Sequence, residues 1–185
     1  MVAACSGAPT YVDGSGPLSS LGSPNYESGR GIGRPVIGEA RSLGDILPLC
    51  VVPERLPRGM TAPASVTVLS YEPLAIDPGI ELIGALIHPL DYSGDSDIDP
   101  GFPPEAGAQA FLPMGSTVSI PACGDASPAV PAVEIVLGVV PLDERGGELR
   151  GVRIEFAFGD GEHRVLDVPG VVVQICGTDM PDVCF

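Results

Sequence analysis

The density of glycine and proline is the feature that most restricts how this chain can fold. There are 25 glycines and 21 prolines, which together make up a quarter of the 185 residues. Both residues disfavour the interior of a helix, and no ten-residue window without them shows apolar side chains at helical spacing. We therefore expect many turns and short strands, and no long helix.

From Arg34 onward, short apolar runs alternate with turn signals at the spacing typical of a β-sandwich. Val152, Ile154 and Phe156 alternate with more polar residues, as in a half-buried strand. The segment Gly159-Asp160-Gly161 then suits a hairpin reversal, and a second hairpin is expected at residues 143–148. The predicted strands are 35–37, 46–52, 64–71, 80–87, 117–120, 132–140, 152–158, 163–168 and 171–176.

Composition divides the chain into two parts. Residues 6–33 are rich in Gly, Ser and Pro and carry no periodic apolar pattern, which is typical of a flexible linker. We therefore predict a lipobox remnant and linker over residues 1–33, and a folded domain over residues 34–185. The fold class expected is all-β: an immunoglobulin-like antiparallel β-sandwich preceded by a disordered N-terminal tether.

The segment Val2-Ala3-Ala4-Cys5 resembles a bacterial lipobox, in which small residues precede the cysteine that receives the lipid. A polar tail follows it, as expected for an anchored protein. The basic and apolar regions of a signal peptide are missing before the motif, so we expect a trimmed chain or a precursor that starts earlier. The competing interpretation is that Cys5 is an ordinary thiol.

The other four cysteines, Cys50, Cys123, Cys176 and Cys184, form no C-x-x-C pair, which removes support for a zinc ribbon or a thioredoxin-like site. Their even number favours two disulfides and an oxidising, extracytoplasmic compartment. Three pairings are possible. We weigh Cys50–Cys123 with Cys176–Cys184 against Cys50–Cys176 with Cys123–Cys184, and the sequence alone does not choose between them.

The chain is strongly acidic, with a net charge of −15 and arginine as its only basic residue apart from histidine. A nucleic acid or an anionic lipid surface would repel it. No apolar stretch is long enough to span a bilayer. We therefore expect membrane attachment by the lipid anchor only, no nucleic-acid partner, and a cell-envelope protein or other surface component as the partner.

Residues 89–113 form a long, acidic, proline-rich excursion within the expected domain. Its alternating aspartates could turn several carboxylates toward a Ca²⁺ ion, which takes six to eight oxygen ligands. The EF-hand pattern fails, however, because Pro100 and Ala106 stand where a glycine and a glutamate are needed. A solvated acidic loop is the alternative. The candidate metal ligands are Asp91, Asp95, Asp97 and Asp99.

Residues for catalysis are few. The two histidines, His88 and His163, have no serine or cysteine nucleophile beside them in the sequence. Asp143 and Glu144 are paired carboxylates, but they lie beside a glycine turn, where burial cannot tune them. We therefore expect no enzyme activity, no catalytic residue and no cofactor other than the possible Ca²⁺.

Three strand motifs carry a family resemblance: DPGIELIGALI at residues 77–87, GVRIEFAF at 151–158 and GVVVQIC at 170–176. With them the chain resembles uncharacterised actinobacterial extracytoplasmic proteins that have one immunoglobulin-like domain behind a membrane anchor. The resemblance implies a fold and a compartment but no functional residues.

The function expected is that of a non-catalytic surface lipoprotein that binds or scaffolds another envelope component. The alternatives are a Ca²⁺-dependent binding module and an enzyme of unrecognised type. A partner-binding module should show an exposed apolar patch or a free sheet edge.

Overall fold

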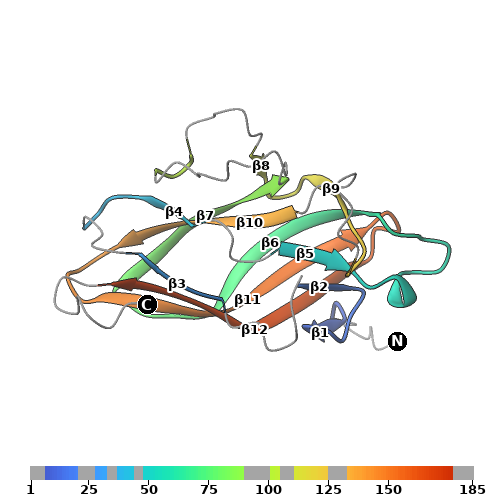
Figure 1. Ribbon diagram of the computed structural model, residues 1–185, viewed down its shortest axis with the longest axis horizontal. Helices are drawn as coiled ribbons and strands as arrows, with labels where there is room; N and C mark the ends of the chain where they lie inside the picture. Colours follow the sequence, from blue (N-terminus) through green and yellow to red (C-terminus); the bar gives the residue numbers. More distant parts are fainter. Residues whose placement is uncertain are drawn as a thin grey trace, which may run out of the picture.

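A computed structural model describes residues 7–20, 28–32, 37–43, 48–89, 101–104, 111–124 and 133–176. These residues form two packed sheets of six strands each, so the predicted all-β sandwich is confirmed (Figure 1). The only helical segment in these ranges is the short 3-10 turn η1 (Pro53–Arg55). Within the same ranges, no helix has the length and apolar character needed to cross a membrane.

The first sheet has the order β1, β12, β11, β6, β9, and β3 also pairs with β12. Its pairings are antiparallel, except that β1 and β3 run parallel to β12. The β11–β12 hairpin turns at Gly161, which has a positive φ, as the sequence predicted. The bounds are β1 Thr10–Val12, β3 Ser28–Ile32, β6 Ala64–Ile76, β9 Thr117–Ile120, β11 Gly146–Phe158 and β12 His163–Cys176.

The second sheet has the order β2, β5, β10, β7, β8, and β4 also pairs with β10. All of its pairings are antiparallel. The strand β10 is central and buried along almost its whole length. The bounds are β2 Leu18–Ser20, β4 Arg41–Leu43, β5 Pro48–Val51, β7 Ile80–Pro89, β8 Leu112–Pro113 and β10 Val133–Pro141.

The core lies between the sheets and follows the alternation seen in the sequence. Val152, Ile154 and Phe156 of β11 are completely buried, as are Ile135 and Leu137 of β10. Each such side chain contributes about 1.5–3 kcal/mol by leaving water. The inward face of β11 therefore confirms the half-buried strand that the sequence predicted.

A disulfide joins Cys50 in β5 to Cys123, which follows β9, with a Cα–Cα distance of 4.9 Å. It therefore ties the second sheet to the chain leaving the first. The first of the two weighed pairings is confirmed for this bridge, and the Cys50–Cys176 alternative is wrong. Cys5, Cys184 and the side chain of Cys176 lie outside the described residues, so lipidation and the second disulfide stay predictions.

The linker expected before Arg34 is corrected where β1, β2 and β3 form. Leu18 is fully buried in the core, so its neighbours are held on the sandwich. The carboxylate of Asp13 accepts hydrogen bonds from the Ser19 hydroxyl at 2.6 Å and the Ser20 backbone amide at 2.8 Å. Strands of three to five residues are too short to show periodicity, and only pairing with β12 and β5 reveals them.

Three smaller expectations also change. Ile37, the described end of the first predicted strand, lies in a turn, and β4 forms at Arg41–Leu43 instead. The last two predicted strands are one strand, β12, with a register shift opposite Gly151. The turn at residues 143–146 is not a hairpin, because it connects β10 of the second sheet to β11 of the first.

Candidate functional site

Part of the acidic excursion covers the outer face of the second sheet. Gly84 of β7 lies directly opposite Gly138 of β10, and the Phe102 ring rests on both. A Cβ atom at Gly138 would lie closer than 3.0 Å to three atoms of that ring. The Ser42 hydroxyl of β4 donates a hydrogen bond to the Gly101 carbonyl. The absence of side chains at the two glycines thus lets the Phe102 ring pack on the sheet, which holds residues 101–104 against it.

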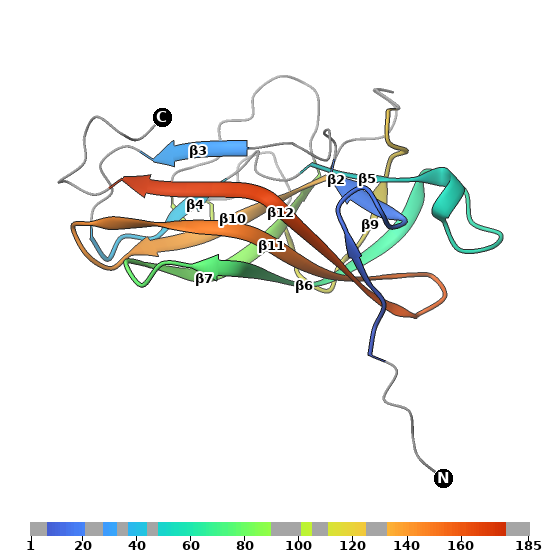
Figure 2. The same ribbon diagram turned by 90° about the horizontal axis from the view of Figure 1, so that it is seen from below.

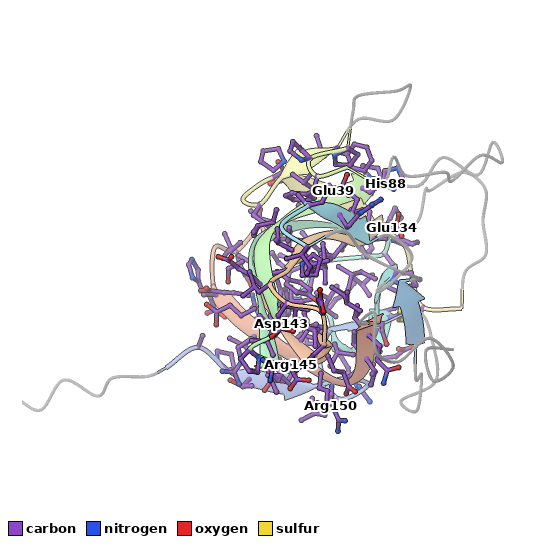
Figure 3. All side chains as sticks on the ribbon, turned by 90° about the vertical axis from the view of Figure 1, so that its left-hand side faces the viewer. Glu39, His88, Glu134, Asp143, Arg145 and Arg150 are labelled. Atoms are coloured by element: carbon purple, nitrogen blue, oxygen red, sulfur yellow. A yellow bond between two sulfur atoms is a disulfide. The ribbon has the colours of Figure 1, made fainter. Side chains whose placement is uncertain are left out.

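A buried hydrogen-bonded pair of polar side chains lies on the same face of the second sheet. His88 of β7 and Glu134 of β10 are opposite each other in the sheet, and Nδ1 lies 2.6 Å from Oε1 (Figure 3). Both residues are 0% exposed, and the Phe111 ring stacks on the imidazole with centroids 4.7 Å apart. A buried charge is stable only when it is paired, so each residue accounts for the burial of the other.

The chemistry open to this pair follows from its hydrogen bond. An ionised carboxylate accepts the Nδ1 proton of His88 and thereby orients the opposite nitrogen, Nε2. Nε2 is buried and has no hydrogen-bond partner among the described residues. In the described ranges, however, no three His, Cys, Asp or Glu side chains are grouped so that they could hold a metal. The hydrogen bond of the pair joins β7 to β10.

Glu134 was not singled out by the sequence interpretation. The signal was nevertheless present, because Glu134 is the one charged residue in the apolar run VEIVLGVV at residues 133–140. A single charge in a strand buried on both faces requires a partner. His88 ends the neighbouring apolar run, which would have suggested the pairing.

His163 lies in a different setting from His88. It is exposed and pairs with Glu155 at 2.7 Å, rather than with its sequence neighbours Asp160 and Glu162. Those two carboxylates instead bind the guanidinium of Arg164 at 2.7 and 3.0 Å. The hydrogen bond from Arg164 lowers the pKa of Asp160. These contacts brace the β11–β12 hairpin.

Asp143 also lies in a structural pair. Its carboxylate accepts hydrogen bonds from the Arg145 side chain, and these hold its pKa below the usual range (Figure 3). A general acid at neutral pH needs the opposite shift. The position of Asp143 at a connection between the sheets therefore fits the exposed turn charge that the sequence predicted.

One side of the sandwich has two unpaired strand edges, which together we call the open edge. The strand β9 pairs with residues 64–67 of β6, and within the described residues no strand follows it along residues 69–76. The strand β8 pairs with Leu86 and Ile87 of β7. Residues 80–85 of β7 pair with β10 on one side, and no strand among the described residues pairs with their other side. In Figure 2, β7 and the adjoining part of β6 form one long side of the molecule, opposite β3.

The open edge exposes apolar side chains. Leu74 is 41% exposed, Ile76 39% and Ile83 42%, and Ala75 is exposed between the first two. Leu74 also packs on the bare backbone of Gly151, where a Cβ atom would lie 2.7 Å from its Cδ1 atom. Three consecutive exposed apolar residues, on a strand with one edge unpaired among the described residues, form a surface suited to association.

The charge of the open edge is negative. Glu72, Asp77 and Glu81 are exposed there, and the sequence has no lysine or arginine from Gly59 to Glu144. Glu72 lies opposite Arg153, whose guanidinium already makes two hydrogen bonds to Asp167 at 2.7 and 2.8 Å. The open edge therefore combines apolar side chains with carboxylates.

The predicted calcium ligands Asp91, Asp95, Asp97 and Asp99 lie outside the described residues, so the calcium site stays a prediction. Comparison of the chain with protein-family models, with curated protein sequences and with solved structures found no match. The geometry of the described residues is therefore the basis for the function proposed below.

Proposed function

We propose that this protein is a non-catalytic surface lipoprotein whose β-sandwich binds another component of the cell envelope through the open edge. The observation that carries the proposal is the stretch Leu74-Ala75-Ile76, which is apolar, exposed and unpaired on one side within the described residues. Soluble proteins usually shorten, charge or cover such edges because unpaired backbone groups attract other chains. An edge that exposes three consecutive apolar residues is therefore expected to have a partner.

Two further features support the location. The disulfide Cys50–Cys123 fits an oxidising compartment outside the cytoplasm. The lipobox-like segment ending at Cys5 would attach the chain to a membrane that its own negative charge does not favour. Together they favour an anchored domain that meets its partner at the cell surface.

The test is cross-linked capture from native membranes, using the full chain expressed behind its natural signal. We expect the parent protein to capture a discrete envelope component. A variant carrying Leu74→Ser and Ile76→Ser should lose that capture, because it removes the exposed apolar side chains without altering the buried core. Val12→Ser is the matched control, since Val12 is 56% exposed on β1, away from the open edge.

Two outcomes would contradict the proposal. One is that the parent captures nothing above background, and the other is that the Leu74 and Ile76 variant captures as well as the parent does. The anchor is tested separately with Cys5→Ser, which should release the protein from the membrane fraction. If this variant stays in the membrane as firmly as the parent, lipidation at Cys5 is wrong.

A further inference from the structure

Resting on the binding function proposed above, we propose that the partner contributes an extended, positively charged segment that pairs as an additional strand with residues 69–76 of β6. The inference specifies the backbone conformation and the charge of the partner. It depends on three properties of the open edge: its unpaired backbone, its carboxylates and its exposed apolar side chains.

The backbone of β6 favours a strand as the partner. Along residues 70–76, β6 pairs in continuous register with β11, which holds it extended. No strand among the described residues pairs with its other side, which leaves backbone amide and carbonyl groups there for an added strand, and Pro73 is the single residue in 69–76 without an amide proton. An added strand satisfies such groups in sequence, as in other complexes formed by strand addition. A stretch of eight residues accommodates a segment about 26 Å long.

The charge of the open edge favours a basic partner over a second copy of this chain. Glu81 has no ion pair among the described residues, and Arg153, which lies opposite Glu72, is already bound by Asp167. A second copy would bring more carboxylates and its own charge of −15 to this edge. Like charges on adjacent strands are unfavourable, whereas lysine or arginine side chains would pair with Glu72 and Glu81.

The exposed side chains define the pattern of the partner. Side chains in a strand alternate between its two faces, so one face of an added strand lies beside Leu74 or Ile76 while the other faces away. Ile83 on β7 extends the apolar surface past the turn at residues 77–79. The segment that fits best therefore contains apolar residues, which lie beside Leu74 and Ile76, together with lysine or arginine, which pair with the carboxylates of the open edge.

The test uses three synthetic ten-residue peptides as probes with the full chain. One alternates valine with arginine, one alternates valine with glutamate, and one is the basic peptide with two central prolines. Binding is measured by fluorescence anisotropy at 50 and 300 mM salt, and amide hydrogen exchange reports which strand is covered. We expect the basic peptide to bind at least about ten-fold more tightly than the others, and to slow exchange at residues 69–76.

Salt and charge variants give matched controls. Raising the salt from 50 to 300 mM should weaken the binding of the basic peptide about ten-fold, because its contacts with the glutamates are exposed to solvent. Glu72→Gln with Glu81→Gln should weaken it about five-fold, whereas Glu54→Gln, at an exposed glutamate on η1, should not. All three substitutions are at the surface and leave the core intact.

Several results would overturn the inference. Equal binding of the acidic and basic peptides would remove the charge argument. Protection of a strand other than β6, or binding without protection, would remove the strand argument. Protection of residues 69–76 in a dimer without peptide would assign the edge to a second copy. If capture from membranes depends on Leu74 and Ile76 but the basic peptide does not protect β6, the binding function stands and this inference fails.

Discussion

Replacing Gly138 by alanine would place a methyl group where the Phe102 ring lies. Three ring atoms would be closer than 3.0 Å to the new Cβ atom, whereas ordinary contacts begin near 3.4 Å. The ring must therefore move away from the sheet by about 1 Å, which also loosens the segment that it anchors. The backbone at Gly138 does not have a positive φ, so strain in the main chain does not complicate the result.

The magnitude follows from what the Phe102 ring contributes. Forcing a side chain out of a packed site costs about 1–3 kcal/mol. Phe102 is only partly buried, so Phe102→Ala should lower the free energy of unfolding by about 2 kcal/mol, which is less than the loss expected for a fully buried ring. Gly138→Ala alone should cost about 1.5 kcal/mol. With Phe102 already replaced, Gly138→Ala should cost less than about 0.5 kcal/mol, because alanine is otherwise preferred to glycine in a strand.

The assay is urea unfolding followed by far-ultraviolet circular dichroism, since the chain has no tryptophan. The two single variants and the double variant form a cycle whose interaction energy should be about 1–2 kcal/mol. Gly84→Ala is the milder companion, because its Cβ atom would lie 3.0 Å from the ring. If the costs of Phe102→Ala and Gly138→Ala simply add, the ring does not sit on Gly138 and the reasoning is refuted.

Three further outcomes are expected. Gly79→Ala should cost more than about 2 kcal/mol in urea unfolding, because its Cβ atom would overlap the rigid backbone carbonyl of residue 146, whereas Gly159→Ala should change stability by less than about 0.5 kcal/mol; equal effects would contradict this. Replacing Cys50 and Cys123 by serine should cost up to about 4 kcal/mol, since the bridge closes a loop of 73 residues, and a variant that melts like the oxidised parent would count against it. Because the hydrogen bond from arginine lowers the folded pKa of Asp160, its stabilisation is present above the unfolded pKa of about 3.9 and is lost as the pH falls through the folded pKa. The stability difference between the parent and Asp160→Asn should therefore disappear in acid, and a difference that persists near pH 2 would show that the ion pair is not its source.

Local patterns in the sequence predicted much of the fold. The alternation in β11 predicted which side chains enter the core, because a strand half-buried on one face has a period of two. The glycine turn after Phe158 predicted the β11–β12 hairpin for the same local reason. Features that depend on residues close together in the chain could therefore be predicted from the sequence.

The candidate site was much harder to predict from the sequence. The sequence indicated that a free edge or apolar patch would mark a binding module, but it did not indicate where the edge would be. Leu74 and Ile76 resemble any other apolar residues of a strand, but they are exposed, and β9 pairs only with residues 64–67 of β6. Which strand lacks a neighbour depends on the arrangement of the whole sheet, and no local pattern encodes it.

The sequence by itself determined the fold class, the inward face of β11 and the strong negative charge, since each follows from the kinds of residue and their spacing. Only the tertiary structure determined that Leu18 belongs to the core, that His88 meets Glu134, and that Cys50 bonds Cys123. The physical reason is the same in all three cases. Each contact joins segments far apart in the chain, and its free energy depends on which strands become neighbours when the two sheets pack.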